Sequence, residues 1–126
     1  MSDEWLQSTL GEVAEVVGGG TPSTKEPAYW GGDIPWLTPT EVVRADGKTI
    51  ARSDRTITSL GLAKSSANLL PTGAVLLTTR ASVGFTAIAA APLATNQGFQ
   101  SLVPRDDLLP GFLMLWIQAN REEFRS

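Results

Sequence analysis

The sequence predicts an α+β fold: a single domain with a mixed, mostly short-stranded sheet, a few short helices and a C-terminal helix. Three observations support this prediction. Several β-rich runs of a few residues follow one another, the helical patterns between them are few and short, and a longer helical pattern comes last. The length of 126 residues fits one domain, which we assign to residues 1–126.

The first third of the chain mixes short apolar runs with loop-forming residues. Leu10 to Val17 is either a short strand or one helical turn, because periodicity cannot decide at this length. The glycines and the proline of residues 18–22 then interrupt regular structure. An aromatic segment from Pro27 to Pro39 follows. Because Pro35 cannot donate a hydrogen bond to a strand ladder, we expect this segment at a sheet edge or outside the sheet.

The middle of the chain contains a polar segment, a short helix and a buried strand. Arg44 to Arg55 is polar and includes an Asp46-Gly47 turn, which predicts an exposed hairpin or loop. Thr58 suits the N-cap of a helix from about Ser59 to Ser66, because its hydroxyl can accept a bond from a free N–H of the first turn. The continuous β-rich run from Ala74 to Thr79 predicts a strand covered on both faces.

Two more strands and one helix are expected in the last third. Phe85 to Ala90 and Phe99 to Val103 are the strand candidates. Pro110 to Phe124 is the clearest helix, since proline suits a first helical position and apolar residues recur at helical spacing. These apolar residues are Leu113, Trp116, Ile117 and Phe124. The pattern reaches Ser126 without a glycine cap, so we expect the natural protein to continue.

The composition excludes several kinds of chemistry. The chain has no cysteine and no histidine, which removes disulfides, thiolate nucleophiles, cysteine zinc sites and Ser-His-Asp catalysis. The carboxylates are scattered, with no pair spaced for acid–base work or a metal site. We therefore expect no catalytic residue, no metal and no cofactor in this chain. It has no secretory signal and no apolar stretch of about 18 residues, so we expect a cytoplasmic protein without a membrane span.

The charge is unevenly distributed along the chain. A net charge of −3 argues against nucleic-acid binding. The stretch from Arg44 to Arg80, however, has six basic and two acidic side chains, a net charge of +4, which leaves −7 for the remainder. A positive face turned toward phosphates is compatible with this distribution. On charge alone, an ordinary solvated loop is the simpler interpretation.

Two local patterns suggest catalysis or nucleotide binding and are better explained structurally. Gly18 to Lys25 lacks the lysine, hydroxyl and helix order of a phosphate loop, because Glu26 and Pro27 follow. Lys64 and Ser65 are adjacent, so on a helix they would not face each other as a nucleophile pair. Both patterns predict ordinary loop or surface residues.

Aromatic and amide side chains suggest contacts with bases. The aromatic residues can stack bases, but only Lys25 is near them in sequence, so we favour a role in pinning an irregular segment to the sheet. They are Tyr29, Trp30 and Trp36. Asn96-Gln97 either reads adenine with amide contacts or bonds to local backbone in a tight turn.

Six blocks of sequence follow one another in a specific order. They are Leu10-Gly11-Glu12-Val13 with Gly20-Thr21-Pro22-Ser23, the run Tyr29-Trp30-Gly31-Gly32-Asp33-Ile34-Pro35-Trp36-Leu37, Ile57-Thr58, Leu69-Leu70-Pro71-Thr72-Gly73-Ala74-Val75-Leu76, Arg80-Ala81-Ser82-Val83-Gly84 and Ala94-Thr95-Asn96-Gln97-Gly98-Phe99. In this order they closely resemble the target-recognition domain of type I restriction-modification specificity subunits, over about residues 10 to 117.

The resemblance implies DNA recognition without catalysis. Specificity subunits of this kind carry two recognition domains joined by long helices, and each domain reads one half of a bipartite double-stranded DNA site. The helices hold methyltransferase (modification) subunits, and translocating restriction subunits complete the enzyme. Methyl transfer uses S-adenosylmethionine, and translocation uses ATP with Mg²⁺, all expected on the partner subunits. The chain departs from the family in stopping near the start of its last helix, so it is either an excised domain or a natural truncation. That departure puts stable assembly with the partners in question.

Base readout is expected between the resemblance blocks, because the blocks themselves set loops and strands. The hypothesis for DNA binding names Arg44, Lys48, Arg52 and Arg55, with Thr38, Thr40, Arg80 and Ser82 nearby. An arginine can read guanine with two hydrogen bonds, whereas other contacts only hold phosphates.

Two alternatives belong to other functional classes. In the first, the chain is a protein-interaction module that uses the apolar face of Pro110 to Phe124, without DNA readout and with self-association through Trp116 and Phe124. In the second, the chain is a small enzyme. The sequence disfavours this alternative because it contains no group of residues suited to acid–base or metal catalysis.

Overall fold

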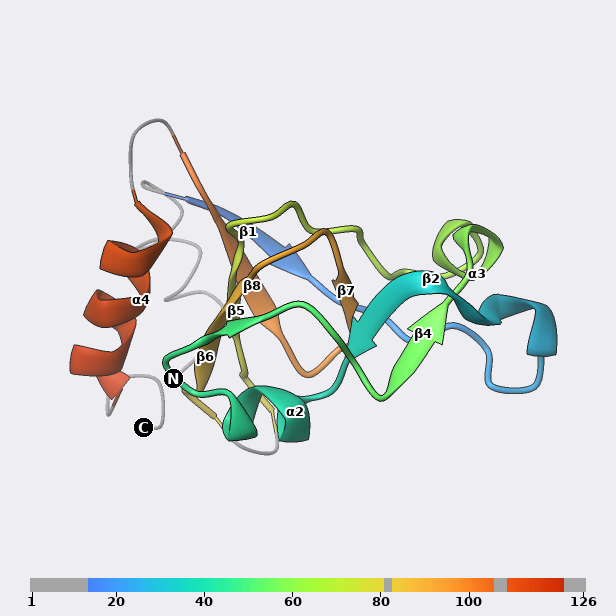
Figure 1. Cartoon of the computed structure of the whole chain (residues 1–126), viewed down its shortest axis with the longest axis horizontal. Helices are drawn as coiled ribbons and strands as arrows, with labels where there is room; N and C mark the ends of the chain where they lie inside the picture. The colour runs from blue at the N-terminus through green and yellow to red at the C-terminus, as the bar shows by residue number, and fades with distance from the viewer. Residues whose placement is uncertain (1–13, 81–82, 106–108, 122–126) are drawn as a thin grey trace.

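Two β-sheets and three α-helices make up the described part of the chain, residues 14–80, 83–105 and 109–121 of a computed structural model (Figure 1). In chain order the elements are β1 (Ala14–Gly18), the 3-10 helix η2 (Pro27–Tyr29), β2 (Trp30–Leu37), α2 (Pro39–Arg44), β3 (Thr49–Ile50), β4 (Arg55–Ile57), α3 (Ser59–Ala63), β5 (Val75–Leu77), β6 (Thr86–Ala89), β7 (Ala94–Thr95), β8 (Gln100–Pro104) and α4 (Pro110–Ala119). One sheet has the order β1-β8-β5-β6-β3 and the other β4-β2-β7.

The observed architecture confirms the predicted α+β class, because the strands are short, their pairing is mixed and a helix comes last.

Strand β5 is the centre of the five-stranded sheet. It pairs antiparallel with both β6 and β8, β1 pairs antiparallel with β8, and β3 runs parallel to β6. All three residues of β5 are fully buried, which confirms the strand expected between Ala74 and Thr79. A strand covered on both faces reads as a continuous apolar run, and this is why the sequence identified it.

Helix α4 packs on one face of this sheet (Figure 1). Leu113 and Ile117 are buried against Val75 and Leu77, as the helical spacing predicts. Trp116 packs half-buried against the same cluster, and Phe124 lies outside the described residues. Of the helices that the structure describes, none has the length and apolar character that crossing a membrane requires.

The opposite face of the large sheet is covered by residues of the second sheet and of α2. Leu37 at the end of β2 and Val42 of α2 belong to one buried cluster with Leu76 and Phe99 of the large sheet region. The end of β2 and the start of α2 are therefore fixed to the core. The basic segment that follows α2 therefore starts at a helix that is packed against the core.

Strand β2 is the central strand of the three-stranded sheet, so the expectation that the aromatic segment lies at a sheet edge or outside the sheet was wrong for the strand as a whole. Pro35 stands opposite Thr56 in the antiparallel pairing of β2 with β4. The parallel pairing with β7 involves only Trp36 and Leu37. At Pro35 the strand thus has a neighbour on one side only, and the missing N–H of proline interrupts no ladder there.

The segment from Arg44 to Arg55 forms a loop with one short strand and no hairpin, because β3 and β4 join different sheets. The predicted turn is present, and Gly47 has a φ of 81°, a conformation that favours glycine. Asp46 forms an ion pair of 2.8 Å with Arg121, just after α4, and accepts a hydrogen bond from the N–H of Thr86. These contacts hold the turn against both the large sheet and the C-terminal helix.

The helix expected after Thr58 is present and ends earlier than predicted, at Ala63. The Thr58 hydroxyl accepts a 3.0 Å bond from the N–H of Gly61, and its O–H donates a 2.7 Å bond to the carbonyl of Ala28. The first bond caps the helix, as expected from the sequence. The second connects the cap to the segment before β2.

A buried serine on β8 gives a first testable prediction. The Ser101 hydroxyl is fully buried and has no hydrogen-bond partner within residues 14–80, 83–105 and 109–121. We expect Ser101→Ala to raise the free energy of unfolding by about 1 kcal/mol, because an unpaired buried hydroxyl is costly and a methyl group is not. Urea titration measures this change.

A second serine provides the matched control. The Ser53 hydroxyl oxygen accepts a 2.9 Å bond from the backbone N–H of Trp36. Ser53→Ala should therefore lower the free energy of unfolding by about 1 kcal/mol. A loss of stability in both variants would contradict the prediction for Ser101.

Candidate nucleic-acid interface

The carboxylate of Glu41 fastens α2 to the segment that carries the candidate arginines. Thr38 precedes the helix as its N-cap, and Glu41 is the third helical residue. One Glu41 oxygen accepts bonds from the Thr38 N–H at 3.1 Å and from its hydroxyl at 3.2 Å. The other accepts a 3.0 Å bond from the backbone N–H of Asp54. With only 8% of its surface exposed, Glu41 is a buried link between α2 and the start of β4.

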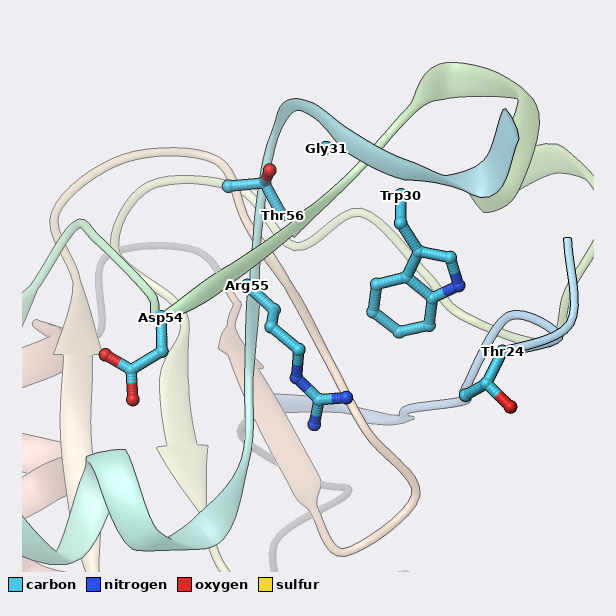
Figure 2. Close-up of a pocket in the computed structure, with 6 residues that line it drawn as sticks. All are labelled: Thr24, Trp30, Gly31, Asp54, Arg55 and Thr56. Atoms are coloured by element: carbon cyan, nitrogen blue, oxygen red, sulfur yellow. The ribbon is translucent and has the colours of Figure 1, made fainter. Parts of the chain in front are cut away.

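Three of the predicted arginines lie beside two adjoining hollows, and we call Arg44, Arg52 and Arg55 the arginine surface. The smaller hollow has a volume of about 200 Å³ and is lined by Glu41, Arg44, Ile50, Arg52, Ser53 and Asp54. The larger, of about 400 Å³, is lined by Thr24, Trp30, Gly31, Asp54, Arg55 and Thr56 (Figure 2). Because Asp54 lines both, the hollows are neighbours. Its carboxylate also lies 3.5 Å from the guanidinium of Arg44, with both side chains largely exposed.

Arg55 is held by two tryptophan rings. Its guanidinium carbon lies 4.6 Å from the ring centre of Trp36 and 5.4 Å from that of Trp30. The two rings meet edge to face, with centres 5.0 Å apart and an interplanar angle of 87°. Cation–π attraction of this kind contributes about 0.5–1 kcal/mol at exposed sites and more where water is excluded. The side chain of Arg55 thus has a defined direction at the mouth of the larger hollow (Figure 2).

The same tryptophans fasten the glycine-rich loop to the second sheet. The indole N–H of Trp36 donates a 2.9 Å bond to the carbonyl of Gly20, and that of Trp30 donates a 3.0 Å bond to the carbonyl of Ser23. Trp36 itself is buried, with 2% of its surface exposed. These contacts confirm the structural role favoured for the two tryptophans.

The structure does not gather the other predicted residues at the two hollows. Thr38 is engaged with Glu41, and Thr40 is exposed on the first turn of α2. Lys48 is exposed, and its backbone carbonyl accepts a bond from Ile88 of β6, which places it beside the large sheet. Arg80 is exposed in the loop after β5 and lines neither hollow. Ser82 lies outside the described residues.

The side-chain oxygens of Asn96 and Gln97 accept hydrogen bonds within the protein. The Asn96 side-chain oxygen accepts a 2.8 Å bond from the N–H of Gly98. The Gln97 side-chain oxygen accepts a bond from the hydroxyl of Thr21. Of the two readings left open by the sequence, the Asn96 contact favours the tight turn, whereas the Gln97 contact links this turn to Thr21 of the glycine-rich loop. Among the described residues there is also no group of three carboxylates placed to hold a metal ion.

The sequence reasoning missed Glu41 and the part that Asp54 plays at this surface. A signal for Glu41 was present, since Thr38-Pro39-Thr40-Glu41 has the threonine and glutamate spacing of a capping box. No local signal existed for Asp54, whose backbone is held by Glu41 and whose carboxylate faces Arg44. That role depends on the fold.

Comparison with known proteins identifies related sequences over nearly the whole chain. Residues 2–126 match the family model of the type I restriction modification DNA specificity domain. The type I restriction enzyme MjaIX specificity subunit of Methanocaldococcus jannaschii is 43% identical over 110 residues, covering 87% of this chain and 26% of that protein. The EcoR124I/EcoR124II specificity subunit of Escherichia coli is 30% identical over 116 residues, covering 87% of this chain and 27% of that protein.

Solved structures show the same arrangement of elements. The HsdS subunit from Thermoanaerobacter tengcongensis aligns with a TM-score of 0.65 and 25% identity, covering 91% of this chain and 27% of that chain. A chain from a structure of the type I R-M system aligns with a TM-score of 0.67 and 23% identity, covering 90% of this chain and 27% of that chain, a likeness in fold. The present chain spans about a quarter of the length of these relatives.

Proposed function

Because this chain belongs to the family of type I restriction modification DNA specificity domains, we propose that it recognises one half of a bipartite double-stranded DNA target for a type I restriction-modification complex. The observation that carries the proposal is the 43% identity with the MjaIX specificity subunit across 87% of this chain. In this proposal the domain selects the DNA, and partner subunits methylate and cleave it.

The arginine surface supports DNA as the ligand. Three guanidinium groups on one surface attract phosphates, although the net charge of the whole chain is −3. Asp54 partly offsets this attraction next to Arg44. In this proposal the phosphate contacts position the duplex, and contacts to base edges select the sequence.

The proposal assigns the chemistry to other subunits. Modification subunits bind S-adenosylmethionine, restriction subunits bind ATP and Mg²⁺, and this domain contributes no catalytic residue and no cofactor. The complex works in the cytoplasm, where the DNA is.

The alternative of a protein-interaction module has no support from the relatives, which are specificity subunits. Trp116, one of the two residues expected to drive self-association, packs against the core instead. The other, Phe124, lies outside the described residues.

The test transfers the domain into a complete specificity subunit. Residues 1–126 replace the first recognition domain of a characterised subunit, the hybrid is expressed with its modification partners, and methylated bases are mapped across a genome. A new half-site joined to the unchanged second half-site is the expected result. Assembly of the complex with methylation at no new half-site would refute the proposal.

Removing two arginines should weaken binding to all sequences alike. Arg44→Ala combined with Arg52→Ala is expected to flatten the slope of log affinity against log salt concentration by about 2, since each phosphate contact contributes about 0.9. Fluorescence anisotropy with the hybrid complex and labelled duplexes measures this slope.

Lys64→Ala is the control for charge removal. Lys64 is exposed at the end of α3 and lines neither hollow. We expect its slope to stay at the value of the unchanged hybrid. Equal slopes for the double arginine variant and the unchanged hybrid would show that the arginine surface does not face DNA.

A further inference from the structure

Arg55 differs from the other described arginines in what its side chain contacts. Arg44 is paired with Asp54, and Arg121, which lies 4.9 Å from the ring centre of Phe85, is also paired with Asp46 and donates to the carbonyl of Gly84. The guanidinium of Arg55 has no ion pair or hydrogen bond within the described part of the chain, yet it lies over two indole rings. The ring contacts therefore orient the guanidinium of Arg55, while its N–H donors make no hydrogen bond to the described residues.

The contact with the two rings leaves those donors without a hydrogen-bond partner. Cation–π attraction acts on the charge of the guanidinium and takes up none of its five N–H donors in a conventional hydrogen bond. Arg55 is exposed at the mouth of the larger hollow, which has a volume of about 400 Å³ (Figure 2). A ligand with two adjacent acceptors can therefore meet a planar pair of donors whose direction is already fixed.

Fixed orientation favours a base over a phosphate as that ligand. A phosphate offers acceptors in many directions, so a flexible arm binds it well. A base edge offers them in one plane, and holding the side chain in advance removes part of the ordering cost of binding. Guanine alone presents two neighbouring acceptors, O6 and N7, in the major groove, because adenine pairs its N7 acceptor with an N6 donor.

We propose, on the basis of the proposed function, that Arg55 is a specificity-determining residue that reads one guanine of the half-site through O6 and N7, and that Trp30 and Trp36 are its positioning residues. Arg44 and Arg52 bind phosphates and set the register of the duplex. The half-site of this domain then contains a guanine, on one strand or the other, that depends on Arg55.

The first test alters the DNA and leaves the protein unchanged. Once methylation mapping of the hybrid has given the half-site, each guanine is replaced in turn by 7-deazaguanine, which lacks N7, or by inosine, which keeps both O6 and N7. At one position 7-deazaguanine should lower affinity about tenfold while inosine should not. A half-site without guanine, or one tolerant of 7-deazaguanine at every position, overturns the proposal.

The second test uses variants of the hybrid protein. Arg55→Lys keeps the charge and loses the planar pair of donors, so methylation should spread to other bases at that single position. Arg105→Lys, at an exposed arginine that lines neither hollow, is the matched control and should leave the half-site unchanged. Trp30→Leu should relax the same position as Arg55→Lys, a result that a general loss of stability would not produce.

The outcomes separate this inference from the function on which it rests. No new half-site in the unchanged hybrid refutes the proposed function. If the unchanged hybrid methylates a new half-site and Arg55→Lys changes neither that half-site nor the affinity for any duplex, Arg55 contacts a phosphate. This result overturns only the present inference.

Discussion

Replacing Trp36 by alanine is expected to lower the free energy of unfolding by about 3–5 kcal/mol, the range for a buried tryptophan reduced to a methyl group. The ring is buried with Ile57 and Ala94 in the core of the three-stranded sheet. Its N–H is bonded to the carbonyl of Gly20, and its face supports Arg55. The substitution therefore removes three things together: the buried ring in this core, the hydrogen bond to the glycine-rich loop and the ring contact with Arg55.

Trp36→Phe separates these contributions. Phenylalanine keeps most of the buried ring and loses the bond to Gly20, so a cost of about 1 kcal/mol is expected for the missing hydrogen bond. Urea titration followed by circular dichroism compares the two variants with the unchanged chain. A loss below 1 kcal/mol for Trp36→Ala would mean that the three-stranded sheet is not held together by this residue.

The parts of the fold that the sequence predicted are those set by local chemistry. The continuous apolar run of β5 indicates a strand that is buried on both faces. The helical spacing of apolar residues in α4 indicates a helix that is buried on one face. Thr58 capped its helix because its hydroxyl acts on a nearby N–H. The strand that contains Pro35 was misplaced because a proline is tolerated in a central strand when the pairing to β7 begins after it, and no local pattern shows where that pairing begins.

The candidate site was predicted as a set of charges and not as a geometry. The basic segment after α2 was identified from its composition, and Arg44, Arg52 and Arg55 do lie together. Lys48 was separated from them because its backbone joins the large sheet through Ile88. The contact of Arg55 with its tryptophans joins two strands of the second sheet, so it follows from strand register and not from spacing in the chain.

Glu41→Gln is expected to lower the free energy of unfolding by about 1.5–3 kcal/mol, the usual value for hydrogen bonds to a charged group. The carboxylate accepts bonds from two Thr38 donors and from the N–H of Asp54. An amide has one oxygen and two donor hydrogens. One of the bonded N–H groups would therefore face another donor in a buried position, which is costly to leave unpaired.

The effect of Glu41→Gln on DNA binding distinguishes positioning from charge. Removing a negative charge near Arg44 strengthens attraction to phosphates, but one charge across a solvent-exposed surface is worth at most about 1 kcal/mol. Loosening the N–H of Asp54 releases the residue directly before Arg55, so we expect DNA affinity to fall. Glu15→Gln, an exposed change of equal charge on β1, should leave both stability and DNA affinity nearly unchanged. If Glu41→Gln binds DNA more tightly in anisotropy measurements on the hybrid complex, charge and not position governs this surface.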